Sequence, residues 1–300
     1  MNEKLTLPEK FAKHAVKASP GIIDRMAKAR HKVVTAQKPG CQFAFLSKSA
    51  WLEVSGSTDL LDKAAALQSF QAQMQYANQM TKLDKSQIPA LWALSKGIYR
   101  LGPKLVESLQ AAPRYEREDT SIDLLGNFKE WCIYLELPDQ LKTGLLSNID
   151  GCFVAPGIVQ GAADDGVKKC LNIESLDKQT SMTRQFIPLD LTLPDIKSIL
   201  SDSEQLMKQF RELVEQRKAQ LGSNEQGQKL GQKFLDSADM QLQLVPIIVN
   251  FLLFINSPQA ERLLLKTEQT LPCKVEPQLS KKGPRLEPAP RAVIHTLELE

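Results

Sequence analysis

The segment Thr120–Leu137 reads Thr-Ser-Ile-Asp-Leu-Leu-Gly-Asn-Phe-Lys-Glu-Trp-Cys-Ile-Tyr-Leu-Glu-Leu, and the rest of the chain can be organised around it. From residue 131 to residue 137 one set of side chains (Trp, Ile, Leu, Leu) alternates with another (Cys, Tyr, Glu). A period of two, with aromatic and β-branched residues, is typical of a strand. Pro138 ends this strand because proline has no N–H group to donate to a neighbouring strand.

Three further apolar runs follow, at residues 151–159, 168–173 and 184–191. The string Asp164-Asp165-Gly166 separates the first two, and Asp-Gly is a strong hairpin signal. Short apolar runs joined by turn residues predict an antiparallel meander. We therefore predict an α+β fold with a central antiparallel sheet over about residues 120–192, with residues 41–46 as a strand that could join it.

Helical patterns flank this sheet along the chain. Before it, apolar residues at helical spacing predict several helices, including one over residues 86–99. After it, residues 195–221 and 232–256 predict two long helices that pack against the sheet. Prolines and charges dominate from residue 271 onward, so this part is expected to be extended or disordered. The expected organisation is a helical N-terminal region (1–112), a core domain of sheet and long helices (118–268) and an extended tail (269–300).

Composition points to an ordinary globular protein in a reducing cytoplasm. The net charge is only +3, and the five cysteines are widely spaced with no CxxC pair. We therefore expect free and mostly buried thiols. The most apolar run, Leu242–Ile255, is shorter than the ~20 residues that cross a bilayer and contains Pro246 and Asn250, so it predicts a buried core helix.

The motifs of common enzyme classes are missing from the sequence. It has no phosphate-binding loop, no GxGxxG, no GxSxG and no HExxH. His14, His31 and His295 are far apart, and none has further ligands at metal-binding spacing. Cys132 has no histidine nearby to lower its pKa, so a structural thiol is expected. The sequence therefore predicts neither a cofactor nor a metal, and no catalytic role.

Two surfaces remain as candidates for binding. A sheet edge can hold an extended peptide through backbone hydrogen bonds, with side chains received in pockets. We place such a site at the sheet, with Trp131, Tyr134 and Phe186 as its aromatic residues. If helices cover only one face, Trp131 or Tyr134 should be accessible, because they lie on opposite faces. If helices cover both faces, both aromatics are core residues instead.

The second candidate surface is basic. Residues 1–38 carry nine Lys or Arg against three acidic residues, a local surplus of +6. In the expected helix after Pro20, the basic face comprises Arg25, Lys28, Arg30 and Lys32. Such a face can contact phosphates or an acidic partner, and it can equally be a solvated helix surface.

The string Thr120-Ser121-Ile122, followed by Asn127 and Trp131-Cys132-Ile133-Tyr134, resembles the middle of a type V-A anti-CRISPR family of phages and mobile elements. That family lowers production of the type V-A effector nuclease. Other similar segments appear in the same order, namely Ile98–Leu101, Gln185–Pro188, Leu244–Ile247 and Ser280–Gly283. The family tends to continue into a basic segment with His and Trp, whereas this sequence stops at Glu300, so it resembles a C-terminally shortened member.

The resemblance implies a non-catalytic anti-CRISPR inhibitor that acts in the cytoplasm. Its partner would be a polypeptide segment of the type V-A effector nuclease, recognised as it emerges from the ribosome, with loss of the transcript following. The alternative function is a nucleic-acid-binding regulator that uses the basic N-terminal helices. Salt dependence separates the two, because phosphate neutralisation makes nucleic-acid affinity fall steeply with salt.

Overall fold

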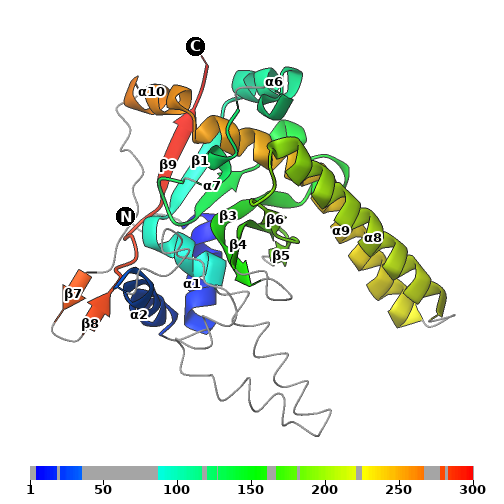
Figure 1. The fold of residues 1–300 in the computed structure, drawn as a ribbon, viewed down its shortest axis with the longest axis horizontal. Coiled ribbons are helices and arrows are strands. Elements are labelled where there is room, and N and C mark those ends of the chain that lie inside the picture. The colour runs from blue at the N-terminus through cyan, green and yellow to red at the C-terminus, as the bar shows by residue number, and fades with distance from the viewer. Residues whose placement is uncertain are drawn as a thin grey trace, which may run out of the picture.

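The protein is described by a computed structural model covering residues 5–18, 21–35, 87–116, 120–126, 128–160, 167–180, 183–220, 225–266, 278–280 and 283–299. Its centre is a seven-stranded mixed sheet with helices on both faces (Figure 1). The expected α+β class is confirmed. The strand expected at residues 41–46 lies outside the described residues.

The antiparallel meander predicted after Thr120 is present. Its strands are β2 (Ile133–Glu136), β3 (Ile149–Gln160), β4 (Val167–Asp177), β5 (Thr183–Gln185) and β6 (Leu189–Asp190). β3 pairs with β2 and β4, and both β5 and β6 pair with β4, all antiparallel. The pair Gln160 and Val167 closes β3 and β4 into the predicted hairpin, whose turn at residues 161–166 is outside the described part.

Two strands that the sequence patterns did not predict extend the meander into a mixed sheet. β1 (Gly97–Leu101) lies parallel to β2, and β9 (Val293–Leu297) lies parallel to β1. Within the described residues, the helix expected over residues 86–99 is present from residue 87 and ends at residue 95. Lys96, with φ at 55°, leaves the helical conformation there, and the chain enters β1 at Gly97. The strands over residues 120–192 are antiparallel as predicted, and the parallel pairs come from strands outside that range.

The proline-rich tail is also more ordered than expected. It contributes β9 to the main sheet and forms a small separate hairpin of β7 (Gln278–Ser280) and β8 (Gly283–Arg285). Backbone bonds hold the approach to β9, because Ala289 donates to the carbonyl oxygens of Ala93 and Leu94. The region expected as an extended tail thus supplies an extended strand to the main sheet.

One face of the sheet is covered by the later helices. They are α6 (Pro103–Ala111), α7 (Asp123–Gly126), α8 (Ile196–Gln220), α9 (Glu225–Ile255) and α10 (Pro258–Lys266). Ile133 and Leu135 of β2 join a core cluster with the apolar stripe of α9, including Leu244 and Ile248. Short 3₁₀ turns connect these elements, at Arg114–Glu116, Asp139–Leu141 and Gly144–Leu146.

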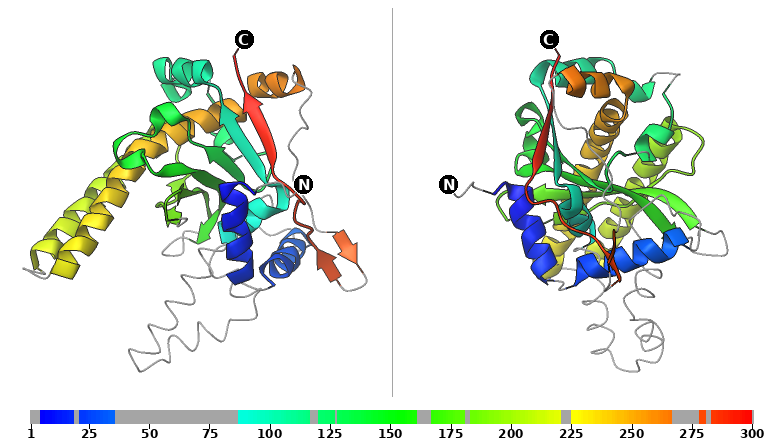
Figure 2. Two further views of the ribbon diagram at one scale, coloured as in Figure 1. Left: turned by 180° about the vertical axis from the view of Figure 1, so that it is seen from behind. Right: turned by 90° about the vertical axis from the view of Figure 1, so that its left-hand side faces the viewer.

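The opposite face is covered by the N-terminal helices. α1 (Leu7–Ala18), α2 (Ile22–Thr35) and the helix over residues 87–95 share a second core cluster with Cys132 and Tyr134. The two alternating sets of β2 side chains thus enter two different cores, as a strand between two helical layers requires. Figure 2 shows helices on both sides of the sheet.

α8 and α9 form a long antiparallel pair that extends away from the sheet (Figure 1). Among the described residues, the part of α9 at Gly231–Ile255 is the one stretch long and apolar enough to cross a bilayer by length and composition. Its most apolar window is 72% buried in the fold, and core helices share these properties. The helix predicted over residues 232–256 starts too late, because α9 begins at Glu225.

A buried asparagine on α9 connects the helix to the chain after α6. The Asn250 side chain donates to the Leu109 carbonyl oxygen at 2.7 Å and accepts from the Arg114 amide at 2.7 Å. We expect Asn250→Ala to lower the free energy of unfolding by about 2 kcal/mol, because two buried backbone groups lose their partner. Asn256→Ala, which removes one bond to the Leu124 carbonyl at a half-buried position, should cost about 1 kcal/mol. Urea denaturation measures both, and equal losses would contradict the expected order.

Candidate functional site

The three aromatic residues expected to bind peptide are all buried. Trp131 and Phe186 are 3% exposed, and Tyr134 is fully buried. Trp131 and Tyr134 both belong to the core beneath the N-terminal helices, and Phe186 belongs to the core beneath α9. The expectation that Trp131 and Tyr134 lie on opposite faces is therefore wrong, because β2 and its regular alternation begin only at Ile133. Helices therefore cover both faces, and these residues form no accessible aromatic patch in this structure.

Tyr134 lies in an aromatic cluster that fixes its ring. The Phe153 ring is 4.8 Å from it and the Trp92 ring 6.3 Å, both edge-on. Its hydroxyl donates to Asp150 Oδ2 at 2.7 Å. Burial, followed by the Asp150 charge, raises the pKa of Tyr134 well above its usual range. Tyr134 is thus a structural residue with a neutral hydroxyl.

The basic group expected on the second helix lies on α2. Arg25 is half-buried and Lys28 is exposed, whereas the side chains of Arg30 and Lys32 are outside the described part. α2 packs against β8, so the hairpin of β7 and β8 contacts part of the α2 surface. The structure therefore places Arg25 and Lys28 of this group on one helix.

Within the described residues, β9 forms one edge of the sheet, at the opposite end from β5. Val293 donates its N–H group to the Lys96 carbonyl, and the Leu297 carbonyl accepts from the Gly102 N–H group. The backbone N–H and C=O groups of the odd-numbered residues of β9 therefore point toward β1. The backbone groups of Ile294 consequently point to the outer side of the strand. The Val293 and Ile294 side chains are 37% and 39% exposed. An apolar edge with outward backbone groups can accept another extended chain.

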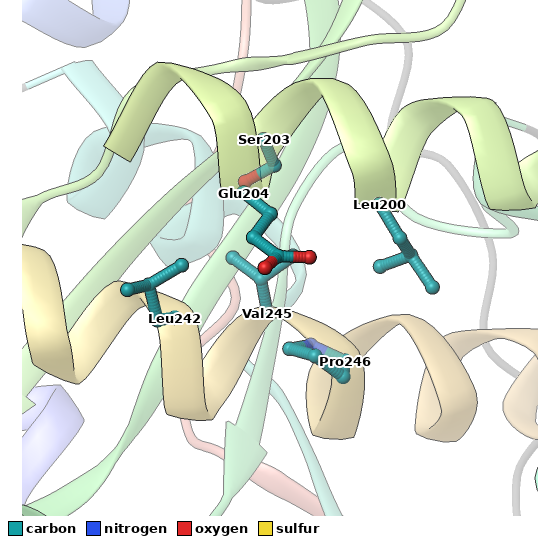
Figure 3. A pocket seen from close by; sticks show the side chains of 6 residues that line it. All are labelled: Leu200, Ser203, Glu204, Leu242, Val245 and Pro246. Carbon is teal, nitrogen blue, oxygen red and sulfur yellow. The ribbon is translucent and has the colours of Figure 1, made fainter. Parts of the chain in front are cut away.

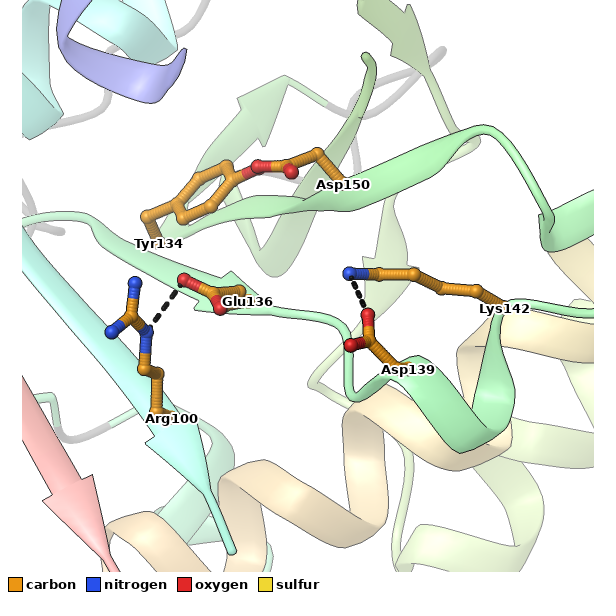
Figure 4. A network of polar contacts seen from close by, with 6 residues as sticks. All are labelled: Arg100, Tyr134, Glu136, Asp139, Lys142 and Asp150. Atoms are coloured by element: carbon orange, nitrogen blue, oxygen red, sulfur yellow. Dashed lines mark hydrogen bonds and ion pairs between the residues drawn. The ribbon is translucent and has the colours of Figure 1, made fainter. Parts of the chain in front are cut away.

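A polar network lies at the carboxyl ends of β1 and β2 (Figure 4). The guanidinium of Arg100 on β1 contacts Glu136 on β2 at 2.8 Å, and Lys142 contacts Asp139 at 2.8 Å. Lys142 lowers the pKa of Asp139 through its hydrogen bond and charge. Arg100 and Lys142 are thus each paired with a carboxylate, and their charges are neutralised at this border of the sheet.

A cavity of about 270 Å³ lies between α8 and α9 (Figure 3). The side chains that line it come from both helices: Leu200, Ser203, Glu204, Leu242, Val245 and Pro246. Sequence patterns did not reveal it, since these residues read as parts of two separate amphipathic helices.

Glu130 is a buried acid that the sequence patterns did not single out. Glu130 is 2% exposed and accepts a 2.9 Å hydrogen bond from the Tyr99 hydroxyl. Burial raises its pKa to about 7, against bonds from Ser95, Tyr99 and the Gly97 amide that lower it. The Tyr99 ring stacks on His295, and burial lowers the pKa of His295 to about 4. A Cβ on Gly97 would lie 2.4 Å from the Glu130 carboxylate, so only glycine leaves room for it.

The three described thiols have a structural role. Cys132, Cys152 and Cys170 are free and buried, and burial raises the pKa of each thiol, that of Cys170 to about 12. A thiol held neutral is a poor nucleophile. Within the described ranges, no group of three His, Cys, Asp or Glu side chains could hold a metal ion.

These features define an α+β protein whose mixed sheet is covered on both faces and ends in an apolar edge strand. The chain belongs to the anti-CRISPR type V subtype A2 family, whose AcrVA2-like model matches residues 99–299, from β1 to just past β9. Membership gives it the role of an anti-CRISPR inhibitor of type V-A systems. No curated protein matches the chain.

The fold is also similar to a solved structure, described as the crystal structure of AcrVA2. The two share 12% sequence identity with a TM-score of 0.54, over 98% of this chain and 84% of that chain. At this identity the likeness concerns the fold.

Proposed function

We propose that this protein inhibits type V-A CRISPR immunity by binding a polypeptide segment of the effector nuclease in the cytoplasm and lowering its production, without catalysis. The observation that carries this proposal is the family match over residues 99–299. The matched range contains the whole main sheet apart from the first residues of β1, together with the long helices.

The outer edge of β9 is the part of the sheet best suited to hold that segment. A newly made chain has unpaired backbone groups, which an edge strand satisfies in register. The buried aromatic residues cannot serve this role without opening the core, whereas Ile294 offers both backbone groups and an exposed side chain. We therefore move the proposed peptide site from Trp131, Tyr134 and Phe186 to β9.

A proline at position 294 tests this placement. Ile294→Pro removes the outward N–H group and leaves the bonds to β1 in place, since proline is tolerated on edge strands where the N–H group faces outward. Peptides tiling the effector nuclease are the probes, with affinity measured by fluorescence anisotropy. We expect Ile294→Pro to weaken binding at least tenfold while its melting temperature stays near that of the parent. Ile294→Ala, which keeps the backbone donor, should bind within a few-fold of the parent.

Three outcomes would count against the proposal. A folded Ile294→Pro variant that binds the peptide as well as the parent would remove β9 as the site. Absence of binding to any nuclease peptide would remove the polypeptide partner. Tight RNA binding that weakens steeply with salt, without peptide binding, would favour the basic surface around Arg25 and Lys28 instead.

Production of the nuclease is tested in cells. Co-expression of the parent protein should lower both the nuclease and its transcript, and Ile294→Pro should restore both. A nuclease level unchanged by the parent protein would contradict lowered production while leaving the binding result to stand by itself.

A further inference from the structure

The cavity between α8 and α9 is large enough to receive one long side chain. Its volume of about 270 Å³ is below the ~300–1,000 Å³ typical of small-molecule sites. Figure 3 shows Glu204 directed from α8 toward α9, close to Val245 and Pro246. The site lies apart from β9, because α8 packs near β6, which pairs with β4 on the far side of the sheet from β9.

The cavity exists because a small residue interrupts an apolar stripe. Along α8 the residues directed at α9 include Ile199, Met207 and Val214, all buried. Ser203 occupies the same stripe and is also buried, but it lacks the volume of a leucine or methionine. The facing residue Pro246 has a compact ring that does not fill the missing volume. Apolar walls from Leu200, Leu242 and Val245 complete the hollow.

The polar groups of the cavity are mainly hydrogen-bond acceptors. Glu204 contributes a carboxylate at the rim. Pro246 lacks an N–H group, so the Leu242 carbonyl oxygen does not receive the donor that an α-helix normally supplies from four residues later. The Ser203 hydroxyl is the one lining side chain that can donate.

An acceptor-rich rim above apolar walls fits a cation carried on an aliphatic stem. Arginine and lysine have this form, because their methylene groups pack on apolar surface while the charged head stays at the rim. Lys208 contacts Glu204 at 2.6 Å, but both side chains are more than half exposed, so solvent screens this pair. An incoming guanidinium or ammonium can therefore share or replace Lys208 at the carboxylate.

We propose that the cavity between α8 and α9 binds an arginine or lysine side chain of a polypeptide partner. The methylene stem packs on Leu200, Leu242 and Val245, and the charged head donates to the Glu204 carboxylate. This site would give the α8–α9 pair its own contact with a partner, in addition to any contact at β9. The experiments that test it are independent of those that test the β9 site.

The test uses the full chain with its leucine and valine methyl groups labelled for NMR. The probes are N-acetyl-arginine methylamide and N-acetyl-lysine methylamide, with a free side-chain amine, and N-acetyl-norleucine methylamide supplies the stem without the charge. We expect at least one cationic probe to produce saturable shifts at Leu200, Leu242 and Val245. Norleucine should bind about two- to fivefold more weakly, as loss of an ion pair at an exposed carboxylate predicts.

Two variants and a control connect these shifts to the cavity. Ser203→Leu reduces the hollow and should abolish the shifts, and Glu204→Gln should weaken binding about two- to fivefold with the walls intact. Glu212→Gln, an exposed position on the same helix, removes one negative charge elsewhere and should change nothing. The proposal is overturned if neither cationic probe gives saturable shifts, if norleucine binds equally well, or if Glu204→Gln binds like the parent. Because Glu204 is exposed, its variant gives a result even if Ser203→Leu does not fold.

Discussion

Replacing Trp92 with alanine should lower the free energy of unfolding by about 3–5 kcal/mol. Trp92 is completely buried between the N-terminal helices and the sheet, with the Phe153 ring at 5.6 Å and the Tyr134 ring at 6.3 Å. Its indole Nε1 donates to the Gly97 carbonyl oxygen at 2.8 Å. Alanine would leave a cavity beneath β1 and would remove the donor to a buried carbonyl.

Two comparisons separate packing from hydrogen bonding. Trp92→Phe keeps most of the apolar volume and loses the donor, so about 1–3 kcal/mol of the loss should remain. Phe234→Ala on α9 removes an aromatic side chain that is 45% exposed and should cost far less than Trp92→Ala. Urea denaturation followed by circular dichroism gives all three values. A Trp92→Ala variant as stable as Phe234→Ala would show that the N-terminal helices do not hold this face of the sheet.

Replacing Glu130 with glutamine should change how stability depends on pH. Burial raises the pKa of Glu130 from 4.5 to about 7 in the folded protein. The folded state therefore binds this proton more tightly than the unfolded state, and the resulting stability is present below pH 4.5 and lost as pH rises to 7. Glutamine does not ionise and avoids this loss. The difference in unfolding free energy between Glu130→Gln and the parent should thus grow by about 3 kcal/mol in favour of the variant from pH 4.5 to 7.

The difference between the two proteins is more informative than the parent curve. Burial lowers the pKa of His295 from 6.5 to about 4, so the folded protein also loses stability as pH falls from 6.5 to 4. Between pH 4.5 and 6.5, Glu130 and His295 change the stability of the parent in opposite directions. The effect of His295 is the same in the parent and in Glu130→Gln, so it cancels when the two unfolding free energies are subtracted. Glu107→Gln, at an exposed position on α6, controls for the removal of one carboxylate. A difference for Glu130→Gln that stays constant from pH 5 to 8 would contradict the buried, proton-binding carboxyl.

The candidate sites show the limits of local patterns most clearly. The chemistry of Trp131 and Tyr134 suited a binding surface, but burial depends on which distant segments cover them, and helices cover both faces. The cavity depends on Ser203 and Pro246 facing each other across two helices, although they are more than forty residues apart. The sequence shows both residues, but only the packing of α8 on α9 brings them together.

Periodicity was sufficient for the meander and for α8. The alternation that ends at Leu137 and the Asp-Gly turn act between neighbours in the chain, so their structural consequence is local. The parallel pairing of β1 with β9 is different, because nearly two hundred residues separate them and no turn connects them. A parallel pair leaves no turn signal in the sequence, and strands this short have weak periodicity. Only tertiary packing therefore decided that the proline-rich tail would complete the sheet and that β9 would become its edge.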